Sequence, residues 1–144
     1  LGFTSTTVDF HNTLEWILYL KAHSALPVVI GGVHMSAYPE ETLSHEAIDY
    51  GIIGDAEETL PEFLRTLSQA GDLGGVKGIC YREGRRVRLT GHREPFRDLD
   101  RIPFPARHLL PNHRYFSLIS RRRNFTAMIT SRGCPYRCVF CDSQ

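Results

Sequence analysis

Three cysteines crowd into the last eleven residues of this 144-residue chain, with a spacing that can bind a metal cluster. Cys134, Cys138 and Cys141 stand in the segment RGCPYRCVFC, which has the pattern C-x3-C-x2-C. Thiolates are the usual protein ligands of iron–sulfur clusters, and a cubane cluster has four irons. Three cysteines of one loop can hold three irons, and the fourth is left for a ligand that is not a protein thiolate. An open metal position of this kind is where a substrate or cosubstrate can bind.

Two other metal sites compete with this interpretation. A zinc site needs a fourth ligand, which His108 or His113 could supply, but zinc motifs more often use paired C-x2-C spacings. A bacterial ferredoxin run has a fourth cysteine nearby. The remaining cysteine, Cys80, lies more than fifty residues upstream in an apolar segment, which favours a buried core thiol over a ligand. An iron–sulfur or zinc-binding module without further chemistry therefore stays as the alternative.

The composition is that of an ordinary globular chain. Apolar residues make up 42% and charged residues 23% of the sequence, with a net charge of +1. That charge gives no field that would attract nucleic acid or anionic lipid. No apolar run reaches the roughly 18–20 residues of a membrane span, and no signal peptide is recognisable. Clustered cysteines without such a signal favour metal binding in a reducing cytoplasm. Because Leu1 is not a methionine and the chain stops just after the cysteines, we expect an internal piece of a longer protein.

The elements that must position these cysteines begin with an alternation of strands and helices. Apolar runs that stop at glycine predict buried strands, and a 3.6-residue apolar period predicts helices. The expected strands are 1–4, 27–30 and 48–53, the expected helices are 12–23 and 57–69, and a further helix begins at Pro39 after a loop. Short alternation of this kind predicts an α/β fold with a Rossmann-like parallel sheet.

The pattern changes after the second long helix. Segments 76–81 and 86–90 flank Glu83-Gly84 and predict a hairpin. Four prolines between 93 and 112 exclude a helix or a central strand, and 125–131 predicts a new strand directly before the cysteine loop. We therefore expect three regions: residues 1–92 as the Rossmann-like domain with its N-terminal part missing, 93–124 as a linker, and 125–144 as the truncated start of a second domain.

The cysteine loop resembles the signature of the radical S-adenosylmethionine (SAM) superfamily, which has this spacing and an aromatic residue before the last cysteine, as Phe140 stands here. The resemblance implies a [4Fe-4S] cluster on Cys134, Cys138 and Cys141, with SAM on the fourth iron and Phe140 beside the cofactor. It also implies that the loop follows the first strand of a partial (β/α) barrel, that a reducing donor such as flavodoxin or ferredoxin supplies electrons, and that SAM is cleaved to a 5′-deoxyadenosyl radical.

The upstream region resembles the later part of the cobalamin-binding domain that precedes many radical SAM barrels. The resemblance is carried by the segments LGFTST, VVIGGVH and DYGIIGDAE, and by the linker segment DLDRIPFP. It implies that Thr4 and Thr6 contact the lower nucleotide of cobalamin at the strand ends. Gly31 and Gly32 lack side chains and would let the nucleotide tail approach the backbone. The alternative for the glycine pair is a tight strand-to-loop turn, and His34 after it either lines the cleft or only packs the loop.

Two further motifs are weaker. Asp9 and His11 resemble part of a cobalt-ligating D-x-H-x-x-G motif, but Leu14 replaces the glycine, so we interpret both as loop and helix-start residues. The run 121–123 of three arginines could touch RNA, as in transfer-RNA-modifying radical SAM enzymes, yet a short basic run is more often solvated surface. The resemblance to radical SAM enzymes with a cobalamin-binding domain implies a radical methylation, rearrangement or cyclisation of an unidentified small-molecule or lipid-like substrate.

Overall fold

The structure is a computed structural model that describes residues 1–96, 98–117, 126–136 and 138–141. The chain divides into two compact units, Leu1–Phe96 and Arg97–Gln144, and each is described by itself. The expected boundary between residues 92 and 93 stays a prediction. The arginine run 121–123 lies outside the described residues.

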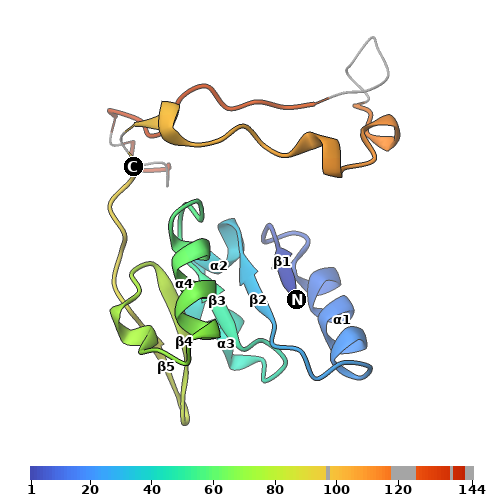
Figure 1. Ribbon diagram of the computed structural model, residues 1–144, viewed down its shortest axis with the longest axis vertical. Coiled ribbons are helices and arrows are strands. Elements are labelled where there is room, and N and C mark those ends of the chain that lie inside the picture. Colours follow the sequence, from blue (N-terminus) through green and yellow to red (C-terminus); the bar gives the residue numbers. More distant parts are fainter. Residues whose placement is uncertain (97, 118–125, 137, 142–144) are drawn as a thin grey trace. The chain divides into compact units, whose positions relative to one another are not determined.

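A five-stranded sheet with the order β1-β2-β3-β4-β5 forms the centre of the first unit (Figure 1). Its strands are β1 (Gly2–Thr4), β2 (Val29–Gly31), β3 (Tyr50–Ile52), β4 (Ile79–Glu83) and β5 (Arg86–Leu89). The first three are parallel, whereas β4 and β5 are antiparallel neighbours. The Rossmann-like sheet is therefore confirmed, and the predicted hairpin extends it: β4 pairs with β3, with Cys80 opposite Gly51.

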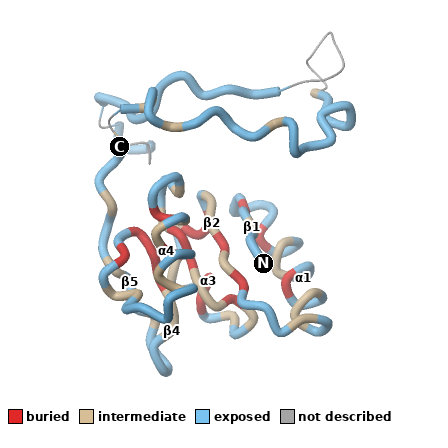
Figure 2. Tube along the Cα trace, in the orientation of Figure 1, coloured by how far each residue is buried: buried red, intermediate tan, exposed pale blue. Residues whose placement is uncertain are grey.

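Helices cover both faces of this sheet. They are α1 (Phe10–Lys21), α2 (Val33–Ala37), α3 (Pro39–Ser44) and α4 (Thr59–Ser68). Side chains of α1, α2 and α3 pack in one cluster with Ile30 and Cys80, while Phe63 of α4 packs in a second cluster with Ile52 and Ile79. Successive strand residues face opposite sides, so the two clusters are the two sides of one core, which Figure 2 displays as the buried part of the trace. The loop expected before Pro39 is wrong in part, because residues 33–37 form α2.

The middle of β3 carries a glycine for a packing reason. A Cβ on Gly51 would lie 2.5 Å from Met35 Cε and 2.6 Å from Cys80 Sγ. The short helix α2 therefore approaches the sheet closely only because no side chain stands there. Burial in this cluster raises the pKa of the Cys80 thiol to about 12, which confirms Cys80 as a buried core thiol.

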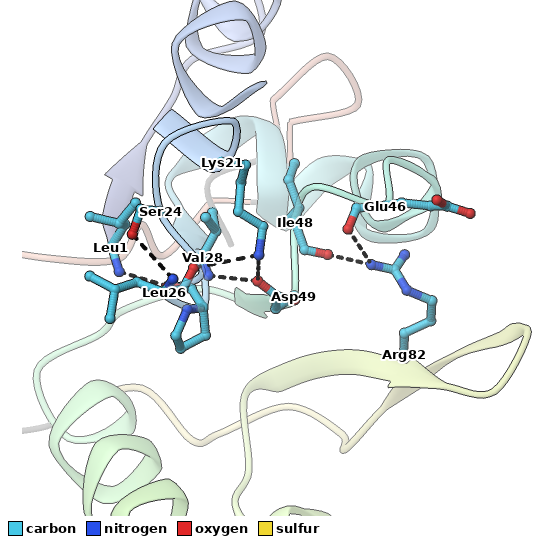
Figure 3. Close-up of polar contacts among 10 residues, drawn as sticks. Leu1, Lys21, Ser24, Leu26, Val28, Glu46, Ile48, Asp49 and Arg82 are labelled. Atoms are coloured by element: carbon cyan, nitrogen blue, oxygen red, sulfur yellow. Dashed lines mark hydrogen bonds and ion pairs between the residues drawn. The ribbon is translucent and has the colours of Figure 1, made fainter. Parts of the chain in front are cut away.

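Polar groups tie the amino ends of the parallel strands together (Figure 3). The Asp49 carboxylate accepts hydrogen bonds from the Val28 amide at 2.7 Å and the Lys21 ammonium at 3.0 Å. It thus links the end of α1 to the starts of β2 and β3. Nearby, the Arg82 guanidinium donates to the carbonyls of Ile48, at 2.5 Å, and Leu43, so β4 holds the segment that leads from α3 into β3.

The strand predicted at 125–131 is wrong over the residues that the structure describes. Residues 126–131 are exposed and have no ladder partner there, and residue 125 lies outside the description. The physical reason is that a strand is stable only beside a hydrogen-bonded neighbour. The described part of the linker holds three short 3-10 helices, Leu99–Arg101, Arg107–Leu109 and Asn112–Arg114. None of the helices in the described part of the chain has the length and hydropathy needed to cross a bilayer.

Replacing Asp49 with alanine should lower the free energy of unfolding by about 1–3 kcal/mol, because the half-buried Val28 amide and Lys21 ammonium lose their shared acceptor. Urea unfolding followed by circular dichroism measures this change. Glu15→Gln is the control: this carboxylate pairs with His11 at 3.4 Å on the exposed side of α1, and its loss should change stability by less than about 0.5 kcal/mol. Equal effects of the two substitutions would contradict the assignment.

Candidate functional site

The carboxyl ends of the three parallel strands meet at one edge of the sheet. Thr4 and Gly31 end β1 and β2, and they are opposite each other in the ladder. The backbone continues from these ends into Ser5 and Gly32, and the Ser5 amide donates to the Gly31 carbonyl at 3.1 Å. The crevice outside such strand ends is where α/β sheets bind their ligands.

The two neighbouring glycines differ in what their missing side chains permit. Gly32 has a φ of +97°, and a Cβ there would lie 2.6 Å from the Ser5 carbonyl oxygen and 2.7 Å from Thr4 Oγ1. A Cβ on Gly31 would be 3.7 Å from its nearest neighbour, a carbon of Ile52. Gly32 therefore allows the chain to approach itself, as in the tight-turn alternative, whereas Gly31 has ordinary space around it.

The two threonines predicted from the sequence lie on the exposed side of this junction. Thr4 ends β1, and Thr6 follows in the loop to α1, where its hydroxyl donates to Asp9 Oδ2 at 2.8 Å. The Thr6 oxygen keeps lone pairs with which to accept. Asp9 precedes the first residue of α1, and His11 lies in its first turn beside Glu15. The interpretation of Asp9 and His11 as loop and helix-start residues is confirmed.

His34 is a stronger candidate than the sequence indicated. Its side chain is only 3% exposed, and its ring stacks on Phe10 with centroids 3.9 Å apart. Nδ1 lies 3.4 Å from Thr7 Oγ1, and the backbone amide donates to the Ser5 carbonyl. Nε2 is buried without a hydrogen-bond partner among the described residues. Buried polar atoms without partners are rare in folded proteins and call for an explanation such as a ligand. The only sequence signal for this burial was the position directly after a glycine pair and a valine.

Ser36 was missed altogether. Its hydroxyl accepts a hydrogen bond of 2.9 Å from the amide of Gly54, which lies two residues after the end of β3. Gly54 has a φ of +73° and nothing within 4 Å of the position of a Cβ. This bond ties α2 to the third strand end, so all three strand ends are connected through α2. A serine among apolar helix residues gave no sign of this role.

A cavity at the other end of the sheet is a weaker candidate for a functional site. It has a volume of about 310 Å³ and is lined by Asp49, Tyr50, Arg82 and Gly84. Its carboxylate and its guanidinium already hold backbone groups and Lys21. These contacts indicate a structural role for the charged groups.

The cysteine loop lies in the second unit and is exposed throughout its described residues. The Cys141 amide donates to the Cys138 carbonyl at 3.1 Å, which forms a turn between them, and Gly133 bends the chain at a φ of +78°. Phe140 is 89% exposed. Over the described ranges, no three His, Cys, Asp or Glu side chains gather as a metal site, so the structure does not bring Cys134, Cys138 and Cys141 together.

Comparisons with known proteins show what the chain is similar to. The family model described as "B12 binding domain" matches residues 1–64. An uncharacterized methyltransferase of Pyrococcus horikoshii is 38% identical over 146 residues, which cover 100% of this chain and 31% of that protein. The hopanoid C-3 methylase of Methylococcus capsulatus is 31% identical over 129 residues, covering 85% of this chain and 24% of its own length. The chain thus spans less than a third of these relatives.

A solved structure agrees with the family model and with the sequence relatives. The radical SAM methyltransferase TsrM from Kitasatospora setae, with cobalamin and a [4Fe-4S] cluster bound, superposes with a TM-score of 0.56 and 25% identity. The match covers 62% of this chain and 19% of that one. The fold, the family model and the sequence relatives therefore agree: residues 1–64 match the B12 binding domain, and the chain resembles cobalamin-binding radical SAM methyltransferases.

Proposed function

We propose that the full-length protein is a radical SAM enzyme that binds a [4Fe-4S] cluster, SAM and cobalamin. It catalyses a radical methylation, or another radical rearrangement or cyclisation. One observation carries the proposal: the C-x3-C-x2-C loop with Phe140 stands downstream of a matched B12-binding domain in a single chain. A metal-binding module without SAM chemistry would not need that domain.

The residues at the strand ends fit cobalamin. Gly31 leaves space at the end of β2, Thr4 and Thr6 offer exposed hydroxyl oxygens, and His34 Nε2 is a buried polar atom that lacks a partner among the described residues. These groups would hold the nucleotide tail, with Gly32 keeping the β1 and β2 ends together. When bound, cobalamin supplies a centre for methyl transfer.

The cysteine loop has the donors for the cluster. Cys134, Cys138 and Cys141 would each hold one iron, and the turn between the last two already brings their backbones close. Exposed thiols are open to assembly of a cluster, whereas the Cys80 thiol stays protonated because burial raises its pKa to about 12. Phe140 would shield SAM from water beside the last cysteine. A bound cluster would supply the electron that SAM cleavage needs, and a flavodoxin or ferredoxin would reduce it.

The relatives suggest the substrate class. One is named for a hopanoid, and another, 27% identical over 148 residues, is an anaerobic magnesium-protoporphyrin IX monomethyl ester cyclase from Synechocystis. We therefore propose a small-molecule or lipid-like substrate in a reducing cytoplasm and not a nucleic acid.

The cysteine assignment predicts a selective loss of iron. Replacing Cys134, Cys138 or Cys141 with alanine in the full-length protein, purified without oxygen, should remove the four-iron cluster, because a cubane held by two thiolates is labile. Cys80→Ala should leave iron content unchanged. Iron and sulfide analysis with visible absorption measures the effect. Stoichiometric zinc in place of iron after anaerobic reconstitution would contradict the proposal.

The cobalamin assignment predicts that Gly31→Leu weakens binding of hydroxocobalamin to the full-length protein at least about tenfold, because the proposed site puts the nucleotide tail against Gly31, where a leucine side chain would compete with it. Gly75→Leu is the matched control, since a Cβ there has nothing within 4 Å and the residue lies far along the chain from the strand ends. Absorbance titration measures both affinities. Gly32 is unsuitable for the test because its side chain would strike Thr4 and Ser5. Binding by Gly31→Leu as tight as by the control would refute the site.

A further inference from the structure

Four stretches of the first unit meet at Gly78, just before β4. The Ile53 amide, directly after β3, donates to the Gly78 carbonyl at 2.8 Å, and the Gly78 amide donates to the Gly91 carbonyl at 2.8 Å. A Cβ on Gly78 would lie 3.2 Å from Thr59 Oγ1, at the start of α4, and 3.5 Å from Arg93 Cβ. The end of β3, the start of α4 and both ends of the hairpin therefore come together at the carboxyl edge of the parallel strands.

Arg93 connects the chain that leaves this junction to α4. Its guanidinium forms an ion pair with the carboxylate of Glu62 in α4, and its Nη1 lies 3.8 Å from Oε2 of Glu58, just before α4. Only 22% of the Arg93 side chain is exposed, against 49% for Glu58 and 39% for Glu62. Because the guanidinium is largely removed from water, its attraction to the two carboxylates is screened less than in an exposed pair.

A second arginine of the hairpin provides a contrast. Arg88 of β5 pairs with Glu83 at 3.1 Å, but the two side chains are 48% and 63% exposed. Glu83 and the Tyr81 ring, over which the Arg88 guanidinium lies, both belong to the hairpin itself. Arg93 instead contacts a residue 31 positions away. Loss of Arg88 should therefore affect the hairpin alone, whereas loss of Arg93 should separate the departing chain from α4.

The loop between β3 and α4 carries this contact toward the candidate cofactor groups. The loop contains Gly54, whose amide donates to Ser36 Oγ of α2 at 2.9 Å. Glu58 is the last residue of the same loop. Ser36 thus holds the loop near the strand ends, and Arg93 holds its other end through Glu58 and Glu62. The departing chain is connected to the edge of the sheet that carries the candidate cofactor groups.

We propose that Arg93 is a positioning residue that fixes the start of the linker to the carboxyl edge of the sheet. The loop after β3 and the chain that leaves the first unit then keep one arrangement. If cobalamin and the cluster are held by different regions of the chain, this attachment limits how freely the two regions move. That consequence rests on the proposed function. The attachment itself lies within the first unit and depends on no bound group.

Hydrogen exchange in the full-length protein tests the attachment on amides that donate hydrogen bonds. The Gly78 amide donates to the Gly91 carbonyl, two positions before Arg93. Its exchange should speed up about tenfold in Arg93→Ala, because the segment that supplies the acceptor loses its attachment and opens locally. The Tyr50 amide, which donates inside the sheet at 3.0 Å, should keep its rate. Arg88→Ala is the matched control and should leave both rates unchanged.

Further variants test the geometry of the ion pairs. Arg93→Lys should restore only part of the protection of the Gly78 amide, because an ammonium lacks the planar fork that reaches two carboxylates. Glu62→Gln should speed exchange less than Arg93→Ala, since Glu58 remains as a partner. Adding Glu62→Gln to Arg93→Ala should have little further effect, because both changes remove the same contact. The exchanged pair, Arg93→Glu with Glu62→Arg, should protect the Gly78 amide better than Arg93→Glu alone.

A second measurement tests the positioning role. Pulsed electron paramagnetic resonance on the full-length protein, with cobalamin in its Co(II) state and the cluster reduced, measures the dipolar interaction between the two centres. The distribution of distances should broaden in Arg93→Ala and stay unchanged in Arg88→Ala. Both variants should retain the cobalamin and iron contents of the wild type, because neither arginine lies at the ends of β1 and β2 or in the cysteine loop.

The outcomes separate the two proposals. A wild-type protein that takes up neither cobalamin nor iron would refute the proposed function, while exchange of the Gly78 amide would still decide the attachment. Exchange at Gly78 in Arg93→Ala equal to that of the Arg88→Ala control, or equal acceleration at Gly78 and Tyr50, would overturn the attachment. An unchanged distance distribution would overturn the positioning role. If Arg93→Ala does not fold, unchanged exchange at Gly78 in Glu62→Gln overturns the attachment instead.

Discussion

The carboxyl ends of the parallel strands form the edge of the sheet that carries the candidate cofactor groups. The geometry of this edge depends on the close approach of Gly32 to Thr4 and Ser5. A side chain at Gly32 would overlap the Ser5 carbonyl, and the φ of +97° is one that other residues rarely adopt. With glycine there, the Ser5 amide binds the Gly31 carbonyl and the Ser5 carbonyl accepts from the His34 amide. The start of α2 is thereby held against the loop that begins α1, and the exposed hydroxyls and His34 lie around one strand end.

The antiparallel hairpin of β4 and β5 also begins and ends at this edge of the sheet. Ile53 donates to the Gly78 carbonyl just before β4 begins, and Gly78 in turn donates to the Gly91 carbonyl just after β5 ends. The hairpin thus starts and finishes at the carboxyl edge of the parallel strands. Arg93 then pairs with Glu62 of α4 and with Glu58 just before α4, so the chain leaves the first unit from the edge that carries the candidate cofactor groups. The opposite edge, tied by Asp49 and Arg82, serves stability.

The four cysteines separate into two chemical classes because of their surroundings. Cys80 packs beside Gly51 and Met35, where burial raises the pKa of its thiol to about 12 and keeps it protonated. The other three are exposed in a loop with a bend at Gly133 and a turn before Cys141. Thiolates are the ligands of iron, so only the exposed class suits a cluster. Among the described residues, the Arg107 side chain of the linker donates hydrogen bonds to Thr126 and Ala127, which precede that loop.

The sequence by itself determined the cysteine spacing, the resemblance to a family and most of the strands and helices of the first unit, although not α2, because apolar period, glycine stops and ligand spacing are local properties of the chain. It placed α4, α3 and the hairpin within a few residues of their observed bounds. Only the tertiary structure decided that the hairpin joins the main sheet and that Gly32 permits a close backbone contact while Gly31 has ordinary space around it. It also decided that His34 is buried, with a ring nitrogen that has no hydrogen-bond partner among the described residues. Each of these depends on contacts between residues distant in sequence, as does the failure of the strand expected at 125–131. A strand is defined by its neighbour, and the pattern of one segment cannot say whether a neighbour lies beside it.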